Sequence, residues 1–273
     1  MYDVPTTLSP SRVEKFTSCP MAFRFASIEK LPEPPTIHTT RGSLVHRALE
    51  LAFTHPAAAR TPELFRACLA TANDEFDELP EIGDLGLDDQ QRTTLRSECA
   101  SLVERYLQME DPTAIHPIGL EVRLSAPIDT LRLQGIIDRL ELRDGQLVVT
   151  DYKTGRAPSA NWEQKSLAGV HFYSFLCEEV FGQRPAAIRL MYLKTGETIE
   201  ATPNDRSINF LRTRTTAVWR AIEKACRDDD FRPRQSALCS SCTFQSWCPS
   251  FGGDPARAAV ELGVALSPAL AAS

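Results

Sequence analysis

The sequence predicts a mixed α/β fold, in which helical segments near both ends enclose a β-sheet. Apolar residues recur at helical spacing before residue 110 and again after residue 207, whereas residues 117–153 alternate apolar and polar side chains as strands do. The order of these segments is typical of a sheet flanked by helices. With 273 residues, 42% of them hydrophobic, the chain is long enough to bury such a core.

Residues 9–110 are expected to be helical. Ser9 followed by Pro10 indicates a helix N-terminus, because serine caps the first turn and proline is favoured at the first helical position. Three proline residues between positions 32 and 35 then require an extended connection. The helices predicted in this part run from Pro10 to about Thr17 and over residues 41–53, 61–77 and 90–109.

A sheet core is expected over residues 117–202, followed by a C-terminal part over residues 207–252. Alternating apolar residues predict strands around residues 120–124, 131–133 and 147–149, and a strand pair is expected around residues 194–197. Longer apolar patterns predict helices over residues 161–181 and 207–227. We therefore expect a single domain over residues 1–252 and an Ala-rich tail over residues 253–273.

The charge balance neither supports nor excludes a polyanionic partner. The net charge is −6, but residues 61–111 carry a local net charge of −9 and residues 206–234 one of +4. A solvated helical face explains such a basic run equally well. No apolar run approaches the roughly 18–20 residues of a membrane span, and no secretion signal is visible. The chain is therefore expected to be a soluble, cytoplasmic protein that does not bind a membrane.

Two aspartates are predicted to face each other across a β-hairpin. Asp144-Gly145 is a strong two-residue turn signal. If this turn pairs the residues on either side of it, the same register places Asp138 directly opposite Asp151. Directly opposed residues have Cβ atoms about 4.5–5.5 Å apart, so two like charges there destabilise the sheet unless something neutralises them.

A divalent cation would neutralise this pair, and carboxylate oxygens suit Mg²⁺ or Mn²⁺. Lys153 lies two residues beyond Asp151 and therefore on the same face of the strand. Two carboxylates and one ammonium group are the parts that metal-assisted phosphodiester hydrolysis needs. The alternative is a surface ion cluster on an exposed strand. His46, in the predicted helix over residues 41–53, could complete a metal site, although a lone helical histidine is more often a packing residue.

The eight cysteines fall into two groups, and stable disulfides are rare in a reducing compartment. Four isolated cysteines are expected to be core residues, namely Cys68, Cys99, Cys177 and Cys226. By contrast, Cys239, Cys242 and Cys248 are close enough in sequence to bind one centre, either an iron–sulfur cluster or zinc. Cys19 is the best candidate for a fourth ligand. A zinc site completed by a histidine or water is the alternative.

Taken together, these residues resemble RecB-type nuclease domains of the PD-(D/E)XK superfamily, and in particular its iron–sulfur branch of AddB-like and Cas4-like proteins. The resemblance covers roughly residues 6–252. Its motifs are Leu8-Ser9-Pro10-Ser11 leading to Cys19-Pro20, Gly42 to His46, Gly135 to Arg139, Asp151 to Gly155, and the terminal cysteine group.

The resemblance implies a restriction-endonuclease-like mixed sheet core and a metal-dependent DNA exonuclease of repair or recombination that acts on single-stranded DNA or DNA ends. It implies that His46, Asp138 and Asp151 bind the Mg²⁺ or Mn²⁺ ion with the Tyr152 carbonyl, and that Lys153 is the catalytic lysine. It also implies that the ligands of a [4Fe–4S] cluster, which joins the N- and C-terminal segments, are Cys19, Cys239, Cys242 and Cys248.

One motif departs from the family pattern. Many relatives carry Gln-x3-Tyr in the helix after the lysine strand; here Tyr173 fits the tyrosine, but Gly169 occupies the glutamine position, and Gln164 and His171 have the wrong spacing. Further candidates for substrate contact are Tyr173, Glu121, Arg139 and Arg156. No P-loop motif occurs, so any helicase activity must come from a partner. The alternative function is a catalytically inactive DNA-binding module that partners a helicase.

Overall fold

The structure is a computed structural model that describes residues 2–83, 85–158 and 163–264, and within these it leaves undescribed the side chains of residues 81 and 163–170. The chain divides into two compact units. The first unit contains the described residues up to Glu33, Ser125–Gln134, and the described residues from Asn209 onward; the second contains Pro34–Leu124 and Gly135–Ile208. Each unit is defined by itself, so the single domain expected over residues 1–252 stays a prediction.

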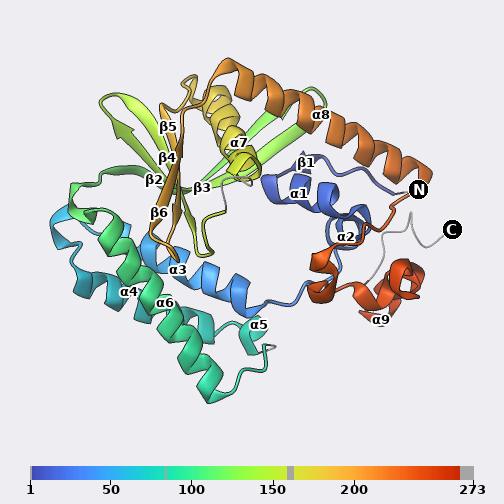
Figure 1. Cartoon of the computed structure of the whole chain (residues 1–273), viewed down its shortest axis with the longest axis horizontal. Coiled ribbons are helices and arrows are strands. Elements are labelled where there is room, and N and C mark those ends of the chain that lie inside the picture. The colour runs from blue at the N-terminus through green and yellow to red at the C-terminus, as the bar shows by residue number, and fades with distance from the viewer. Residues whose placement is uncertain (1, 84, 159–162, 265–273) are drawn as a thin grey trace. The chain divides into compact units, whose positions relative to one another are not determined.

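Figure 1 shows helices and a mixed sheet, which confirms the predicted fold class. The strands are β1 (Thr7–Leu8), β2 (Pro117–Ile128), β3 (Leu131–Arg143), β4 (Gln146–Lys153), β5 (Ala187–Tyr192) and β6 (Glu197–Ala201). The α-helices are α1 (Pro10–Ser18), α2 (Pro20–Phe23), α3 (Ile37–Thr54), α4 (Pro62–Asp77), α5 (Pro80–Gly83), α6 (Asp89–Met109), α7 (Glu163–Phe181), α8 (Asp205–Asp228) and α9 (Ala258–Glu261). A π-helix covers Arg24–Ile28, and the main 3₁₀ turns of the cysteine region are Ala237–Ser241, Gln245–Trp247 and Pro249–Phe251.

Helix boundaries follow their capping residues. α1 begins as predicted, with Pro10 at its first position and the Ser9 hydroxyl accepting the Arg12 N–H at 3.3 Å. α3 begins at Ile37, four residues before the predicted start. Thr36 and Thr39 form a reciprocal capping box there, which satisfies N–H groups at this end of the helix. The prediction considered only apolar spacing and therefore missed this first turn.

The hairpin register was predicted correctly. β3 and β4 pair antiparallel from Arg143↔Gln146 to Arg139↔Thr150, and the turn residues Asp144 and Gly145 have φ values of 49° and 76°. β4 pairs parallel with β5, and β5 antiparallel with β6, while β2 pairs with β3. The sheet is therefore mixed, as expected.

Helices cover both faces of the sheet in the second unit (Figure 1). Leu49 of α3, Phe65 of α4 and Tyr106 of α6 form one buried cluster with Tyr152 of β4. α7 packs on the other face, where a Cβ atom at Gly135 would lie 3.0 Å from Leu176 Cδ1. Consecutive strand residues point to opposite faces, so the β4 residues on either side of Tyr152 face α7.

The first unit has its own apolar core around α1, α2 and the cysteine region. The rings of Phe16 and Phe23 lie 5.2 Å apart, as do those of Phe25 and Phe244. β1 pairs in parallel with the first residues of β3. Among the helices that the structure describes, none combines the length and apolarity needed to cross a lipid bilayer.

The described start of the predicted tail, residues 253–264, belongs to this unit. Gly253 lies so close to an earlier turn that a Cβ atom there would be 2.3 Å from the Ser246 carbonyl oxygen. After it, α9 buries Ala258 and Ala259, and the Trp247 indole N–H donates to Glu261 Oε2 at 2.6 Å. Ala258 and Ala259 therefore serve as small, buried packing residues of this unit.

Candidate functional site

Three side chains from three elements converge in the second unit. His46 of α3, Glu121 of β2 and Asp138 of β3 each offer one ligand atom, and these atoms all lie within 4.8 Å of one another. Among the residues whose side chains are described, no other group of three or more histidine, cysteine or acidic residues is this close. One imidazole and two carboxylates suit Mn²⁺ or Mg²⁺. The residues present therefore fit a divalent cation.

His46 and Asp138 hold the Tyr152 backbone between them. The His46 Nε2–H donates to the Tyr152 carbonyl at 2.9 Å, and Asp138 Oδ2 accepts the Tyr152 N–H at 2.7 Å. His46 Nδ1 lies 3.5 Å from the same carboxylate oxygen. Burial lowers the pKa of His46, but the hydrogen bond and charge of Asp138 outweigh it and raise the pKa to about 9. Of the four groups that the resemblance assigned as ligands, His46 therefore contacts two, namely Asp138 and the Tyr152 carbonyl.

Glu121 reaches this group through an irregular strand. It has a φ of 47° inside β2, a backbone conformation that costs a non-glycine residue about 1–3 kcal/mol. Gly119 is required nearby, because a Cβ atom there would lie 2.4 Å from Val122 Cγ2. Burial and the charge of Asp138 raise the pKa of Glu121 to about 7. The strained strand therefore places the Glu121 carboxylate beside His46 and Asp138 as a third candidate metal ligand. The sequence indicated Glu121 only as a candidate substrate contact.

Asp151 and Lys153 form an ion pair beside this group. Asp151 is 3% exposed; its Oδ2 lies 2.5 Å from Lys153 Nζ, and its Oδ1 accepts the Tyr173 hydroxyl at 2.9 Å. Burial and the charge of Asp138 raise the pKa of Asp151, although Lys153 opposes this. Burial lowers the pKa of Lys153, but Asp151 outweighs it and the pKa is raised. Lys153 is therefore a charged donor held at the site.

The regular backbone pairing of β3 with β4 ends one residue pair before Asp138 and Asp151. Its last pair is Arg139↔Thr150, and the Asp138 side chain, rather than a backbone carbonyl, accepts the next N–H of β4. Asp138 and Asp151 therefore are not a hydrogen-bonded ladder pair. Instead Asp138 belongs to the group with His46, and Asp151 to the pair with Lys153.

Arg139 was predicted to contact DNA, and the structure contradicts this. Its side chain is completely buried and donates to Glu110 Oε1 at 2.5 Å, to the Tyr152 hydroxyl at 2.6 Å and to Glu141 Oε1 at 3.0 Å. Because neighbouring strand residues point to opposite faces, Arg139 lies on the face opposite Asp138. The sequence reasoning missed Glu110, which no motif identifies.

The remaining candidates receive less support. Arg156 is exposed in the segment after β4 and stays a prediction. The side chains of Gln164 and Gly169 lie outside the described residues, so the departure from the glutamine motif is untested. His171 is half-buried, its Nδ1 has no hydrogen-bond partner among the described residues, and burial lowers its pKa.

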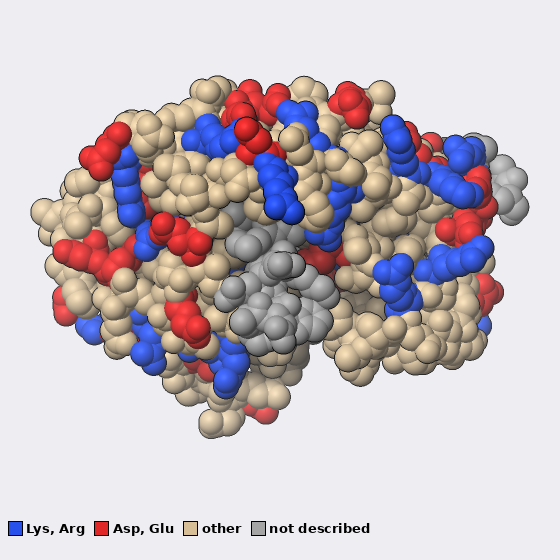
Figure 2. All heavy atoms as spheres, turned by 45° about the horizontal axis from the view of Figure 1, so that its top comes forward, with Lys and Arg blue, Asp and Glu red and all other residues tan. Residues whose placement is uncertain are grey.

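Several basic side chains of the run over residues 206–234 are paired with acidic ones. Figure 2 shows lysine and arginine side chains interspersed with acidic ones on the face that it displays. On α8, both Lys224 and Arg227 contact Asp228. These contacts support the solvated helical face rather than a dedicated path for a polyanion.

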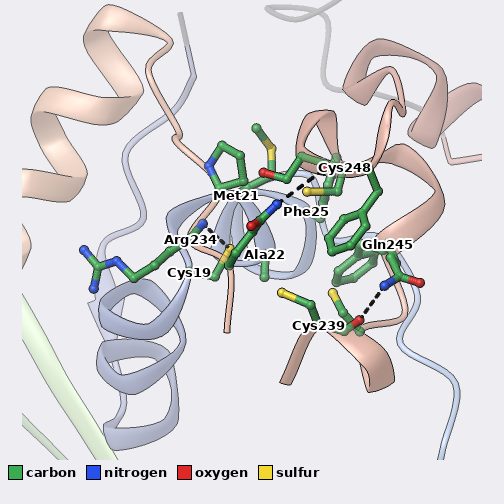
Figure 3. A pocket seen from close by; sticks show the side chains of 14 residues that line it. Cys19, Met21, Ala22, Phe25, Arg234, Cys239, Gln245 and Cys248 are labelled. Carbon is green, nitrogen blue, oxygen red and sulfur yellow. Dashed lines mark hydrogen bonds between the residues drawn. The ribbon is translucent and has the colours of Figure 1, made fainter. Parts of the chain in front are cut away.

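A second candidate site lies in the first unit. Four cysteines, Cys19, Cys239, Cys242 and Cys248, line one solvent-connected pocket. Figure 3 shows the sulfur atoms of Cys19, Cys239 and Cys248 facing this space. Phe25 and Phe244 also line it. The four isolated cysteines are buried, as predicted for core residues. The donor set fits a thiolate-bound metal centre.

The second unit thus combines a mixed sheet flanked by helices with a histidine, several carboxylates and a lysine near the end of the β3–β4 hairpin. Residues 7–249 match the PD-(D/E)XK nuclease superfamily. The chain belongs to this superfamily, which confirms that part of the resemblance drawn from the sequence.

Curated relatives cover the chain to different extents. The Gene 69 protein of Mycobacterium phage L5 is 24% identical over 294 residues, which span 92% of this chain and 100% of that protein. The Gene 69 protein of phage D29 is 23% identical, spanning 89% and 96%. A CRISPR-associated exonuclease Cas4/endonuclease Cas1 fusion of Myxococcus xanthus (strain DK1622) is 29% identical over 136 residues, which are 48% of this chain and 23% of the fusion.

A solved structure supports the fold alone. A protein from Eubacterium rectale, described as a candidate exonuclease, superimposes with a TM-score of 0.56 at 9% identity and covers 87% of both chains.

Proposed function

We propose that this chain is a metal-dependent DNA exonuclease that hydrolyses phosphodiester bonds at single-stranded or frayed DNA ends, in repair or recombination. The observation that carries the proposal is the convergence of His46, Asp138 and the Tyr152 carbonyl beside the Asp151–Lys153 pair. Membership in the nuclease superfamily supports hydrolysis of nucleic acid. The similarity, over 48% of this chain, to a fusion named as a Cas4 exonuclease and Cas1 endonuclease supports action at ends.

His46, Asp138, Asp151 and the Tyr152 carbonyl would hold a Mg²⁺ or Mn²⁺ ion, which would supply positive charge beside the scissile phosphate. His46 must give up its proton before it can bind the ion, because a protonated imidazole has no free lone pair. Glu121 is placed to add a further oxygen ligand.

Lys153 has the role of orienting water and offsetting charge. Its ammonium group is held by Asp151 at 2.5 Å, yet 44% of its side chain remains exposed, so it can also reach a substrate. A fixed cation beside the phosphate stabilises the charge that develops during attack. Tyr173 in turn positions Asp151 through its hydroxyl.

We also propose that the cysteine pocket holds a [4Fe–4S] cluster, as in the iron–sulfur branch of RecB-like nucleases. Four thiol groups and an apolar lining support this assignment. The cluster would supply a cross-link between the segments that carry Cys19 and Cys248. Because the sequence contains no P-loop motif, strand separation would come from a helicase partner.

The test is an anaerobic purification followed by cleavage of end-labelled single- and double-stranded DNA with Mn²⁺. We expect the wild type to shorten DNA from an end and Lys153→Ala to be inactive with an unchanged fold. Lys194→Ala is the matched control, because it removes an exposed lysine that follows β5. A wild type that binds DNA but cuts nothing would replace the proposal by an inactive DNA-binding module.

A further inference from the structure

The cysteine pocket is assembled from two segments that are far apart in sequence. Cys19 follows the last residue of α1 and precedes α2, whereas the other three cysteines lie after α8 within about ten residues of one another. Three of the four sulfur donors are therefore local, and the fourth is remote. Whether all four meet depends on how the segment after α8 is held against the end of α1.

Arg234 makes two contacts across this junction. Its guanidinium Nη1 donates to the Thr17 carbonyl at 2.5 Å, and its backbone N–H donates to Cys19 Sγ at 3.5 Å. Figure 3 shows its side chain extending away from the pocket while its backbone nitrogen faces the sulfur. Thr17 lies in the last turn of α1, where carbonyl groups lack helical partners and a cation is favoured.

The other polar contacts of the pocket stay within the C-terminal segment. The Ser236 N–H donates to Cys239 Sγ at 3.3 Å, and Gln245 Nε2 donates to the Cys239 carbonyl at 3.0 Å. These contacts shape the three-cysteine segment but do not join it to Cys19. Among the described residues that line the pocket, the polar contacts to α1 and Cys19 come from Arg234, beside the apolar packing of Phe25 on Phe244.

We propose that Arg234 is a positioning residue for the metal centre. Its contacts with Thr17 and Cys19, called the Arg234 latch below, hold the three-cysteine segment against the end of α1 so that Cys19 completes the ligand set. The inference rests on the proposed thiolate centre and adds to it a residue that binds no metal. A partner that orients ligands from the outer shell typically contributes about 10- to 100-fold in metal affinity. The latch acts by pre-organising the fourth ligand, which lowers the entropy cost of closing the site.

The experiment compares Arg234→Ala and Arg234→Lys with wild type after anaerobic purification. Iron and sulfide per chain are measured first, and then the rate at which visible absorbance decays in excess chelator. We expect Arg234→Ala to lose the centre about 10- to 100-fold faster. Arg234→Lys should lose the centre at an intermediate rate. Its ammonium group can still donate to the Thr17 carbonyl but lacks the planar guanidinium geometry of arginine.

Arg232→Ala is the matched control. Its side chain is 84% exposed and, within the part of the chain that the structure describes, pairs with Asp230 alone, so the same charge is removed without a contact to α1. It should decay at the wild-type rate. Equal rates of absorbance decay in Arg234→Ala and wild type would overturn the latch. A decay rate of Arg234→Lys as fast as that of Arg234→Ala would also overturn it, because a donor to the Thr17 carbonyl would then have no effect.

The proposed cluster and the latch can fail separately. A wild type that holds no iron but holds zinc would refute the cluster, and the latch would then be judged by zinc release from the same variants. If Arg234→Ala does not fold, the comparison of Arg234→Lys with wild type decides: faster loss of the centre from the folded Lys variant supports the proposed role of Arg234, and equal rates contradict it.

Discussion

Replacing Arg139 with methionine tests whether this arginine is a structural residue or a DNA contact. The side chain is fully buried and pairs with two carboxylates, those of Glu110 and Glu141, whose side chains are 10% and 2% exposed. Methionine keeps much of the volume but removes every donor. Breaking a buried ion pair by removing one partner costs about 3–5 kcal/mol, because the remaining charge stays buried.

The expected cost lies near the lower end of that range. Glu110 keeps Arg189 at 3.1 Å, and Glu141 keeps Arg143 at 2.8 Å, so neither carboxylate becomes completely unpaired. We therefore expect Arg139→Met to lower the free energy of unfolding by about 3 kcal/mol. This is a large part of the roughly 5–15 kcal/mol that stabilises a typical domain.

Urea unfolding followed by far-ultraviolet circular dichroism measures the effect, and Arg143→Met is the control. Arg143 contacts the same Glu141 from the same strand but is 46% exposed, so its loss should cost about 1 kcal/mol or less. DNA affinity is measured at temperatures where both variants are folded. If Arg139→Met unfolds like the control but loses DNA binding, the structural assignment is refuted and the phosphate contact predicted from the sequence is restored.

Three further predictions concern the metal group and its surroundings. Asp138→Asn removes a charged ligand while keeping a side-chain oxygen. We therefore expect the variant to lose Mn²⁺ binding in titration calorimetry while its circular dichroism spectrum stays unchanged. Retained Mn²⁺ binding would contradict the metal site. Mn²⁺ binding at pH 7 should release about one to two protons per ion, because the pKa of His46 is raised to about 9 and that of Glu121 to about 7; a heat of binding that does not depend on the buffer's ionisation enthalpy would rule this out. Burial raises the pKa of Glu110, but Arg139, Tyr106 and Arg189 outweigh it and the folded pKa is lowered, so its stabilisation is present above its unfolded pKa of about 4 and is lost as the pH falls through the folded value. Glu110→Gln should therefore destabilise the chain at neutral pH by more than it does near pH 3, and equal effects at both pH values would argue against the ion network.

Much of the local structure was determined by the sequence alone. The Asp144-Gly145 turn and the alternation of β3 and β4 predicted a register that the structure reproduces from Arg143↔Gln146 to Arg139↔Thr150. Ser9 and Pro10 predicted the start of α1. These features depend on neighbouring residues and on the period of a strand or helix, which short stretches of sequence contain. The superfamily could likewise be identified from motifs, because each motif is local.

Only the tertiary structure decided which atoms meet. Glu121 lies beside His46 and Asp138 because its backbone in β2 has a positive φ, and no residue pattern in the sequence predicts that conformation. Arg139 follows Asp138 directly, yet strand alternation and the packing of α6 bury it on the opposite face beside Glu110. Contacts between distant elements depend on how their faces pack, and sequence periodicity states which face is buried but not which partner it meets.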